Sequence, residues 1–285
     1  MASLQEVKGR MKSIDGTKQI TNAMDLVATA KLTKSRENVK KTRPFFNTVQ
    51  ETIHSIMSNT NGISHPFIRS NKVDNATFVV ISSDMGLCGG YNANVCKLAL
   101  ENIEAKNNAD IITIGKKSRE YFRARDMEIS KEYIGISENP TYIHADGIAS
   151  EIIKRYKEGQ TGEVYLVYTV FESVISQVPK IVRLLPLEPE KFDIDDKKIN
   201  PLMSYDPSPE AVLEYVIPKY ITSVIYGALV ESAASEQGAR MTAMSAATDN
   251  AEEMLEDLNI LYNRARQAEI TQELSEIVGG AEALK

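Results

Sequence analysis

Hydrophobic side chains recur every three or four residues through both ends of this chain, a spacing that predicts helices with one apolar face. In the C-terminal stretch the apolar positions are Leu213, Val216, Ile217, Ile221, Val224, Leu229, Met254, Leu258, Leu261, Ile270, Leu274 and Ile277. The pattern predicts one helix from Pro207 to Gly279–Gly280, with Ser208 as its cap and Pro209 in its first turn. At 1.5 Å per residue this helix would be on the order of 100 Å long, more than a compact domain needs.

The N-terminal stretch, residues 3–57, predicts a second long helix. Ser3 and Glu6 have the spacing of a capping box, in which each side chain bonds a free amide near the other. The spacing of Leu4, Val7, Met11 and Ile14 is typical of a coiled-coil seam. We expect the same face to continue through Ile20, Met24, Val27, Val39, Phe46, Val49, Ile53 and Ile56. Pro44 is expected to bend this helix or interrupt its hydrogen bonds.

The middle of the chain alternates short β-branched runs with helical patterns. Strands are predicted at 77–82, 110–114 and 163–170, with an edge strand at 180–185, and helices at 92–106, 117–125 and 142–157. This alternation predicts a small, mostly parallel, Rossmann-like α/β sheet domain. The fold class is therefore α/β, with a long antiparallel two-helix coiled coil formed by both termini. The predicted boundaries are 1–58, 59–207 and 208–285.

The two terminal helices must run antiparallel if both leave the same domain. The first would then cover the second as far as about Arg264, and about twenty further residues would project as a single helix for roughly 30 Å. This end still carries Ile270, Leu274, Ile277 and Val278, and an exposed apolar face marks an interaction site. The alternative is a helix that folds back or frays at Gly279–Gly280.

Small residues dominate the C-terminal helix between Glu231 and Thr248. They let two helix backbones approach closely and predict a slender, stiff shaft, because alanine is the best helix former. A linker of weak helical propensity is the alternative.

Composition and charge narrow the classes of partner. The net charge is −6, which argues against nucleic acid as the main partner. Residues 1–57 carry ten Lys or Arg against five Asp or Glu, and residues 206–285 carry five against fourteen, so opposite charges favour pairing of the two helices. No apolar run is long enough to span a membrane, and no signal or transit peptide is expected. Cys88 and Cys96 form no CxxC, so neither a disulfide framework nor a metal site is expected.

Three features could carry chemistry. The run Asp84–Gly90 lies between a strand and a helix, where phosphate loops occur, but its glycines match no nucleotide-binding motif, which favours a tight turn. The histidines His54, His65 and His144 are scattered and predict no ligand set. Lys31 to Arg43 holds six cations and one anion, which fits either a solvated helix face or contact with an acidic partner. No catalytic or cofactor site is predicted.

Several motifs resemble the gamma subunit family of F-type ATP synthase from end to end. The matching segments are Ala234–Asn250, Tyr262–Gly280, Ile20–Ala28, Asp84–Asn92, Ser176–Pro179 and Leu184–Pro186. Gly238 stands where the family usually has alanine, which would soften the shaft locally. The cysteine-bearing insertion of the chloroplast type is absent, so redox gating of that kind is not expected.

The resemblance implies a non-catalytic central-stalk rotor that turns inside a ring of three alpha and three beta subunits and couples ion flow to ATP synthesis or hydrolysis. The residues it implies for contact with the ring are Met24, Arg240, Arg266, Gln267, Thr271 and Glu273. Those it implies for contact with the epsilon subunit and the membrane c-ring are Lys31, Lys34, Arg36, Lys40, Tyr205 and Asp206. It implies no cofactor, and a peripheral place on the cytoplasmic side of the plasma membrane.

Two other functions remain open on the residues alone. A nucleotide-binding enzyme with coiled-coil arms would be stabilised by nucleotide. A generic coiled-coil scaffold would associate with itself through the helix end and would need no ATPase partner.

Overall fold

The structure is a computed structural model that describes residues 4–59, 65–68, 73–188 and 208–283. The chain forms two compact units, Met1–Ala28 with Met241–Lys285, and Thr29–Arg240. We call the first the two-helix unit and the second the α/β unit. The helices α1 (Leu4–Asn59) and α5 (Pro209–Ala283) each contribute residues to both units.

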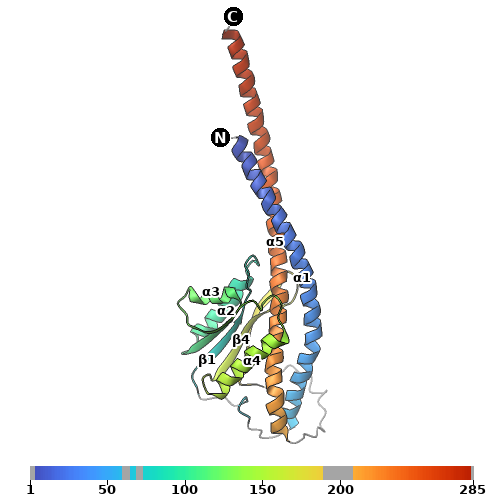
Figure 1. Ribbon diagram of the computed structural model, residues 1–285, viewed down its shortest axis with the longest axis vertical. Helices are drawn as coiled ribbons and strands as arrows, with labels where there is room; N and C mark the ends of the chain where they lie inside the picture. Colours follow the sequence, from blue (N-terminus) through green and yellow to red (C-terminus); the bar gives the residue numbers. More distant parts are fainter. Residues whose placement is uncertain (1–3, 60–64, 69–72, 189–207, 284–285) are drawn as a thin grey trace. The chain divides into compact units, whose positions relative to one another are not determined.

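A five-stranded sheet forms the centre of the α/β unit (Figure 1). Its strands are β1 (Ala76–Ile81), β2 (Ala109–Ile114), β3 (Ile129–Tyr133), β4 (Glu163–Phe171) and β5 (Gln177–Leu185), in the order β3-β2-β1-β4-β5. The four strands β1 to β4 pair in parallel, and β5 pairs with β4 antiparallel at the edge. Pro179 fits β5 because an edge strand tolerates a missing amide donor. The predicted α/β fold class is confirmed.

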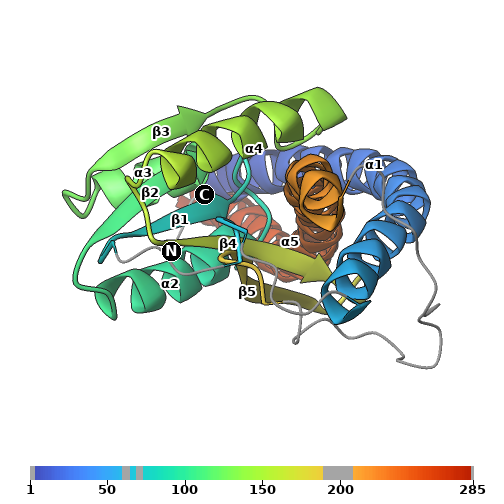
Figure 2. The ribbon, with the colours of Figure 1, turned by 90° about the horizontal axis from the view of Figure 1, so that it is seen from below.

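Helices cover both faces of the sheet (Figure 2). The helix α2 (Tyr91–Glu104) and the helix α3 (Lys116–Arg123) pack over one face, where Phe78 and Val80 of β1 are buried. The helix α4 (Tyr142–Lys157) and the first part of α5 pack over the other face, against Val79 and Ile81. Alternate residues of β1 therefore enter two separate cores, as the two-residue period of a strand requires.

The strand β3 is not predicted by its sequence. Ile-Ser-Lys-Glu-Tyr has no buried residue, because β3 lies at the edge of the sheet and offers its middle positions to solvent. The edge strand β5 was predicted from its apolar run, but β3 has no such run.

Neither Pro44 nor Gly279–Gly280 ends a helix. The helix α1 continues through Pro44, and α5 continues through Gly279 and Gly280 to Ala283. The start of α5 is as expected: Pro209 is its first residue, and the amide of Ala211 donates to Oγ of Ser208 at 3.3 Å. The predicted capping box at Ser3 lies outside the described residues.

Candidate partner-binding surfaces

The two-helix unit is an antiparallel pair, because sequence positions that rise along α5 meet positions that fall along α1. The hydroxyls of Thr21 and Thr248 lie 2.7 Å apart, and Nζ of Lys18 lies 2.6 Å from a carboxylate oxygen of Glu252. These contacts fix the register between the helices. The Lys18–Glu252 pair is the kind of opposite-charge contact that the charge counts of the two helices favour.

Residues that are buried or half-buried recur with heptad spacing on both helices of this unit. Those with this spacing on α1 are Leu4, Val7, Met11, Ile14, Lys18, Thr21, Asp25 and Ala28, and those on α5 are Met244, Thr248, Ala251, Leu255, Leu258, Tyr262 and Ala265. The predicted seam from Leu4 to Ile14 is therefore observed.

The predicted continuation of that face is wrong at Ile20 and Val27, whereas Met24, Val39, Val49, Ile53 and Ile56 are buried or half-buried as expected and the side chain of Phe46 lies outside the described residues. Ile20 is 63% exposed and Val27 is also exposed, while the seam positions nearby hold the polar Thr21 and the small Ala28. On α5, Met254 and Leu261 are likewise exposed, because the seam runs through Ala251 and Leu258 instead. The two-helix unit therefore presents apolar side chains outward along its length.

Beyond Ala265, α5 has no buried or half-buried residue through position 281. We call residues 266–281 the exposed end. Arg266, Gln267, Thr271 and Glu273, which the resemblance implies for ring contact, all lie there and are exposed. The exposed end also carries the apolar side chains Ile270, Leu274, Ile277 and Val278.

Two other expected ring contacts lie elsewhere. Met24 is half-buried in the two-helix unit. Arg240 is only 8% exposed and belongs to the α/β unit, where it pairs with Glu236 and donates from Nη2 to the carbonyl of Gly86 at 3.2 Å. Its ring contact stays a prediction that its burial does not favour.

The expected base contacts on α1 are exposed: Lys31, Lys34, Arg36 and Lys40. All four belong to the α/β unit, and two of them contact other elements of it. Lys31 forms an ion pair with Glu138, and the guanidinium of Arg36 lies 6.0 Å from the ring centroid of Phe171. Tyr205 and Asp206 lie outside the described residues.

The glycine run between β1 and α2 is stabilised from within the chain. The Asp84 carboxylate accepts hydrogen bonds from the amides of Lys116 and Gly135, both at 3.0 Å, and from the hydroxyl of Ser137 at 2.8 Å. Lys116 is the first residue of α3, so the carboxylate lies where an anion would bind at a helix N-terminus. This self-contained arrangement supports the tight-turn interpretation and not a phosphate site.

The cysteines are buried in the core, and His144 takes part in a helix cap. Cys88 and Cys96 are buried free thiols, and burial raises the pKa of both, that of Cys96 to about 12. His144 completes a capping box with Thr141 at the start of α4. Within the described ranges, no three His, Cys, Asp or Glu side chains are grouped to hold a metal ion.

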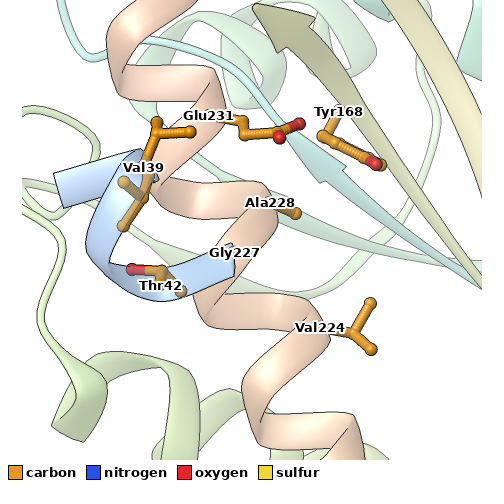
Figure 3. A pocket seen from close by; sticks show the side chains of 8 residues that line it. Val39, Thr42, Tyr168, Val224, Gly227, Ala228 and Glu231 are labelled. Carbon is orange, nitrogen blue, oxygen red and sulfur yellow. The ribbon is translucent and has the colours of Figure 1, made fainter. Parts of the chain in front are cut away.

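One small pocket lies between α1, α5 and β4, with a volume of about 80 Å³ (Figure 3). Val39 and Thr42 line it from α1, Val224 and Ala228 from α5, and Tyr168 from β4. In the part of the chain that the structure describes, no helix combines the length and the apolar character that crossing a bilayer requires.

Comparisons with known proteins agree with this geometry. A family model described as ATP synthase matches residues 3–284. The "ATP synthase gamma chain" of Alkaliphilus metalliredigens is 51% identical over 99% of both chains, and the "ATP synthase gamma chain, sodium ion specific" of Acetobacterium woodii is 44% identical over 99% of both. Among solved structures, a chain of the Euglena gracilis mitochondrial ATP synthase, from a structure of OSCP, F1 and c-ring, shares the fold with a TM-score of 0.72 at 19% identity. That match covers 99% of this chain and 94% of the other.

Proposed function

Because this chain belongs to the ATP synthase family, as a gamma chain and non-catalytic central-stalk rotor, we propose that the exposed end of α5 turns inside a ring of three alpha and three beta subunits. The observation that carries this proposal is the continuity of α5 to Ala283 with Ile270, Leu274 and Ile277 exposed. An apolar helix face of this kind needs a surrounding surface.

The ring contacts would come from the exposed end. Arg266, Gln267, Thr271 and Glu273 offer charges and hydrogen-bonding groups between the apolar positions. A shaft that presents different side chains in each direction binds three identical neighbours differently, and so biases their conformations differently as it turns. Coupling of rotation to catalysis follows from that asymmetry.

The second contact surface would be the cationic face of α1. Lys34, Arg36 and Lys40 are exposed and would meet the epsilon subunit and the c-ring, together with Tyr205 and Asp206. Exposed lysines and arginines favour an acidic partner, chiefly by orienting it. We place the chain peripherally at the plasma membrane on its cytoplasmic side, because the relatives belong to the ATP synthases of bacteria.

Reconstitution tests the rotor function directly. The chain, mixed with alpha and beta subunits, should restore ATPase activity, and in the full complex in sealed vesicles this activity should drive ion pumping. In a Gln267→Cys variant, cross-linking to a cysteine in beta should stall turnover, and reduction should restore it. Free turnover after complete cross-linking would contradict the proposal.

A further inference from the structure

The helix α5 is buried on every side over one short stretch. All nine residues from Ser232 to Arg240 are buried, whereas a helix at a protein surface buries a single stripe. All nine belong to the α/β unit. Small residues there therefore fit α5 into the α/β unit, which corrects the expectation of a slender shaft over this part of the 231–248 segment.

The strand β4 and the turn after it hold one side of this stretch. Ser235 donates from Oγ to the carbonyl of Thr169 at 3.2 Å. A Cβ at Gly238 would lie 3.3 Å from the ring of Phe171 and 3.4 Å from Nε2 of Gln177. Glycine at this position therefore allows a close approach of α5 to the β4–β5 hairpin.

The loop between β1 and α2 holds another side. Ala239 packs in one buried cluster with Cys88 and Tyr91. Arg240 reaches the carbonyl of Gly86 in the same loop. We call the residues around the stretch, namely Gly86, Cys88, Tyr91, Thr169 and Phe171, the collar.

A buried ion pair lies inside the collar. Oε1 of Glu236 and Nη1 of Arg240 are 2.8 Å apart, and their side chains are 4% and 9% exposed. The second oxygen, Oε2 of Glu236, has no hydrogen-bond partner among the described residues. Both residues lie on α5, four positions apart, so the pair does not itself join α5 to the collar; it holds the Arg240 guanidinium, which reaches the carbonyl of Gly86. Burial of two charges costs desolvation energy, so the pair is poor evidence for stability.

We propose that Glu236 and Arg240 are positioning residues that fix the rotational angle and height of α5 in the collar, so that torque passes between the α/β unit and the shaft. This inference rests on the proposed rotor function. The hydroxyls of Ser232 and Ser235 bond the backbone of Thr169 on one side of the stretch, and Arg240 adds a directional bond on the side of the β1–α2 loop. The Arg240 guanidinium, with one bond to Glu236 and one to Gly86, matches only one setting.

The groups around Glu236 act on its pKa in opposite directions. Burial raises the pKa of Glu236, Arg240 opposes this, and Glu138 and Asp84 add to the rise. Cys88 and Tyr91 are the titratable groups on the collar side, and Lys31 is paired with Glu138. Replacement of Glu236 by glutamine therefore removes the charge that holds Arg240 while keeping the volume of the side chain.

The test uses the assembled complex in sealed vesicles, with ATP hydrolysis and ion pumping measured together. Glu236→Gln should keep hydrolysis and its KM for ATP but lose pumping per ATP hydrolysed. Glu214→Gln is the matched control, because it removes a carboxylate from the same helix that pairs with Lys157 at the surface. It should pump like the unchanged chain. If the unchanged chain does not support pumping, the proposed rotor function is wrong. If the unchanged chain pumps and Glu236→Gln pumps equally well, the proposed positioning role of Glu236 and Arg240 is wrong.

A covalent rescue separates positioning from general loss of structure. Ala239→Cys places a second thiol in the buried cluster that holds the native Cys88, and an added thiol oxidant would join the two sulfur atoms with loss of two electrons and two protons, which thiol counting after denaturation verifies. In the Glu236→Gln background, oxidation should restore pumping per ATP and reduction should abolish it. Oxidised Ala239→Cys alone should pump normally, because with Glu236 and Arg240 present residues 239 and 88 already keep one fixed arrangement. Stalled turnover in that variant, or no rescue in the double variant, would overturn the proposal.

Arg240→Lys keeps the charge but cannot make both contacts of the guanidinium. This variant replaces Glu236→Gln in the test if Glu236→Gln does not assemble. We expect Arg240→Lys to lose part of its pumping and the disulfide between residues 239 and 88 to restore it. Pumping by Arg240→Lys equal to that of the unchanged chain would count against the positioning role of Arg240.

Discussion

The hydroxyl of Thr21 on α1 lies 2.7 Å from that of Thr248 on α5, at a seam position where a coiled coil usually holds an apolar side chain. Each hydroxyl also lies within hydrogen-bond distance of a carbonyl in its own helix, Thr21 of Lys18 and Thr248 of Met244. Because each hydroxyl has one proton, one of the two donates to the other and the accepting one donates to its own carbonyl, so the pair joins the two helices at one register.

Removal of this pair should weaken the two-helix unit by a small, measurable amount. Thr21→Val and Thr248→Val should each cost about 1 kcal/mol, and a double-mutant cycle should give a coupling energy of about 0.5–1 kcal/mol. Urea unfolding followed by circular dichroism measures these values. Thr33→Val is the control: Thr33 is exposed and bonds the carbonyl of Thr29 in its own helix, so a change within about 0.5 kcal/mol is expected. A coupling energy of zero would show that the hydroxyls do not interact in solution.

The seam also shows where prediction from sequence succeeds and where it fails. Leu4 to Ile14 were predicted correctly because apolar character and seam position coincide there. After Ile14 they separate: Thr21 lies in the seam, and Ile20 lies outside it. A helix whose apolar residues must serve both a partner helix and another protein gives a mixed pattern, which periodicity alone assigns to one face.

Long-range polar contacts set a different limit. The strands β1, β2 and β4 were predicted because each is a β-branched run covered on both faces of the sheet. The contact of Arg240 with Gly86 joins residues 154 positions apart, and no local pattern announces it. The exposed end of α5, by contrast, was predicted from the lengths of the two helices, because α1 is shorter than α5 and cannot cover all of it.

Gly115 is required by the turn between β2 and α3. Its φ is +93°, and a Cβ there would lie 2.3 Å from the carbonyl oxygen of Ser82. Gly115→Ala should destabilise the α/β unit by about 3 kcal/mol or more, because backbone strain and a backbone clash add.

Gly147 offers the opposite case for the same substitution. It is exposed inside α4, and a Cβ there would meet nothing within 4 Å. Gly147→Ala should stabilise the chain by about 0.5–1 kcal/mol, since alanine favours a helix interior. Thermal unfolding of both variants checks the pair; a lower melting temperature for Gly147→Ala would contradict the account.

The ion pair of Glu151 and Arg155 on α4 should make stability depend on pH. Nε of Arg155 lies 2.8 Å from Oε1 of Glu151, and this hydrogen bond lowers the pKa of Glu151, with Lys131 and Lys154 adding to the effect. A carboxyl whose pKa is lower in the folded state stabilises the fold above its unfolded pKa of about 4.3 and loses that contribution as pH falls through the folded value.

Glu151→Gln should therefore be less stable than the unchanged chain at pH 7, and the difference should shrink as pH falls below about 4. Urea unfolding at a series of pH values measures it. Glu101→Gln is the control, because Glu101 is more exposed and lies 4.0 Å from Lys97. A Glu151→Gln difference that stays constant down to low pH would show that packing, not charge, causes it.

The apolar side chains of the exposed end should matter for assembly and not for folding. Leu274 is 58% exposed, so Leu274→Asp should change the unfolding free energy of the isolated chain by less than about 0.5 kcal/mol. In the proposed ring, the same aspartate would be buried against an apolar surface, and affinity for the alpha and beta subunits should fall about tenfold or more. Ile143→Asp is the matched control, because Ile143 is 80% exposed on α4, in the α/β unit. It should bind the ring like the unchanged chain, and equal losses in both variants would point to a general effect of the added charge.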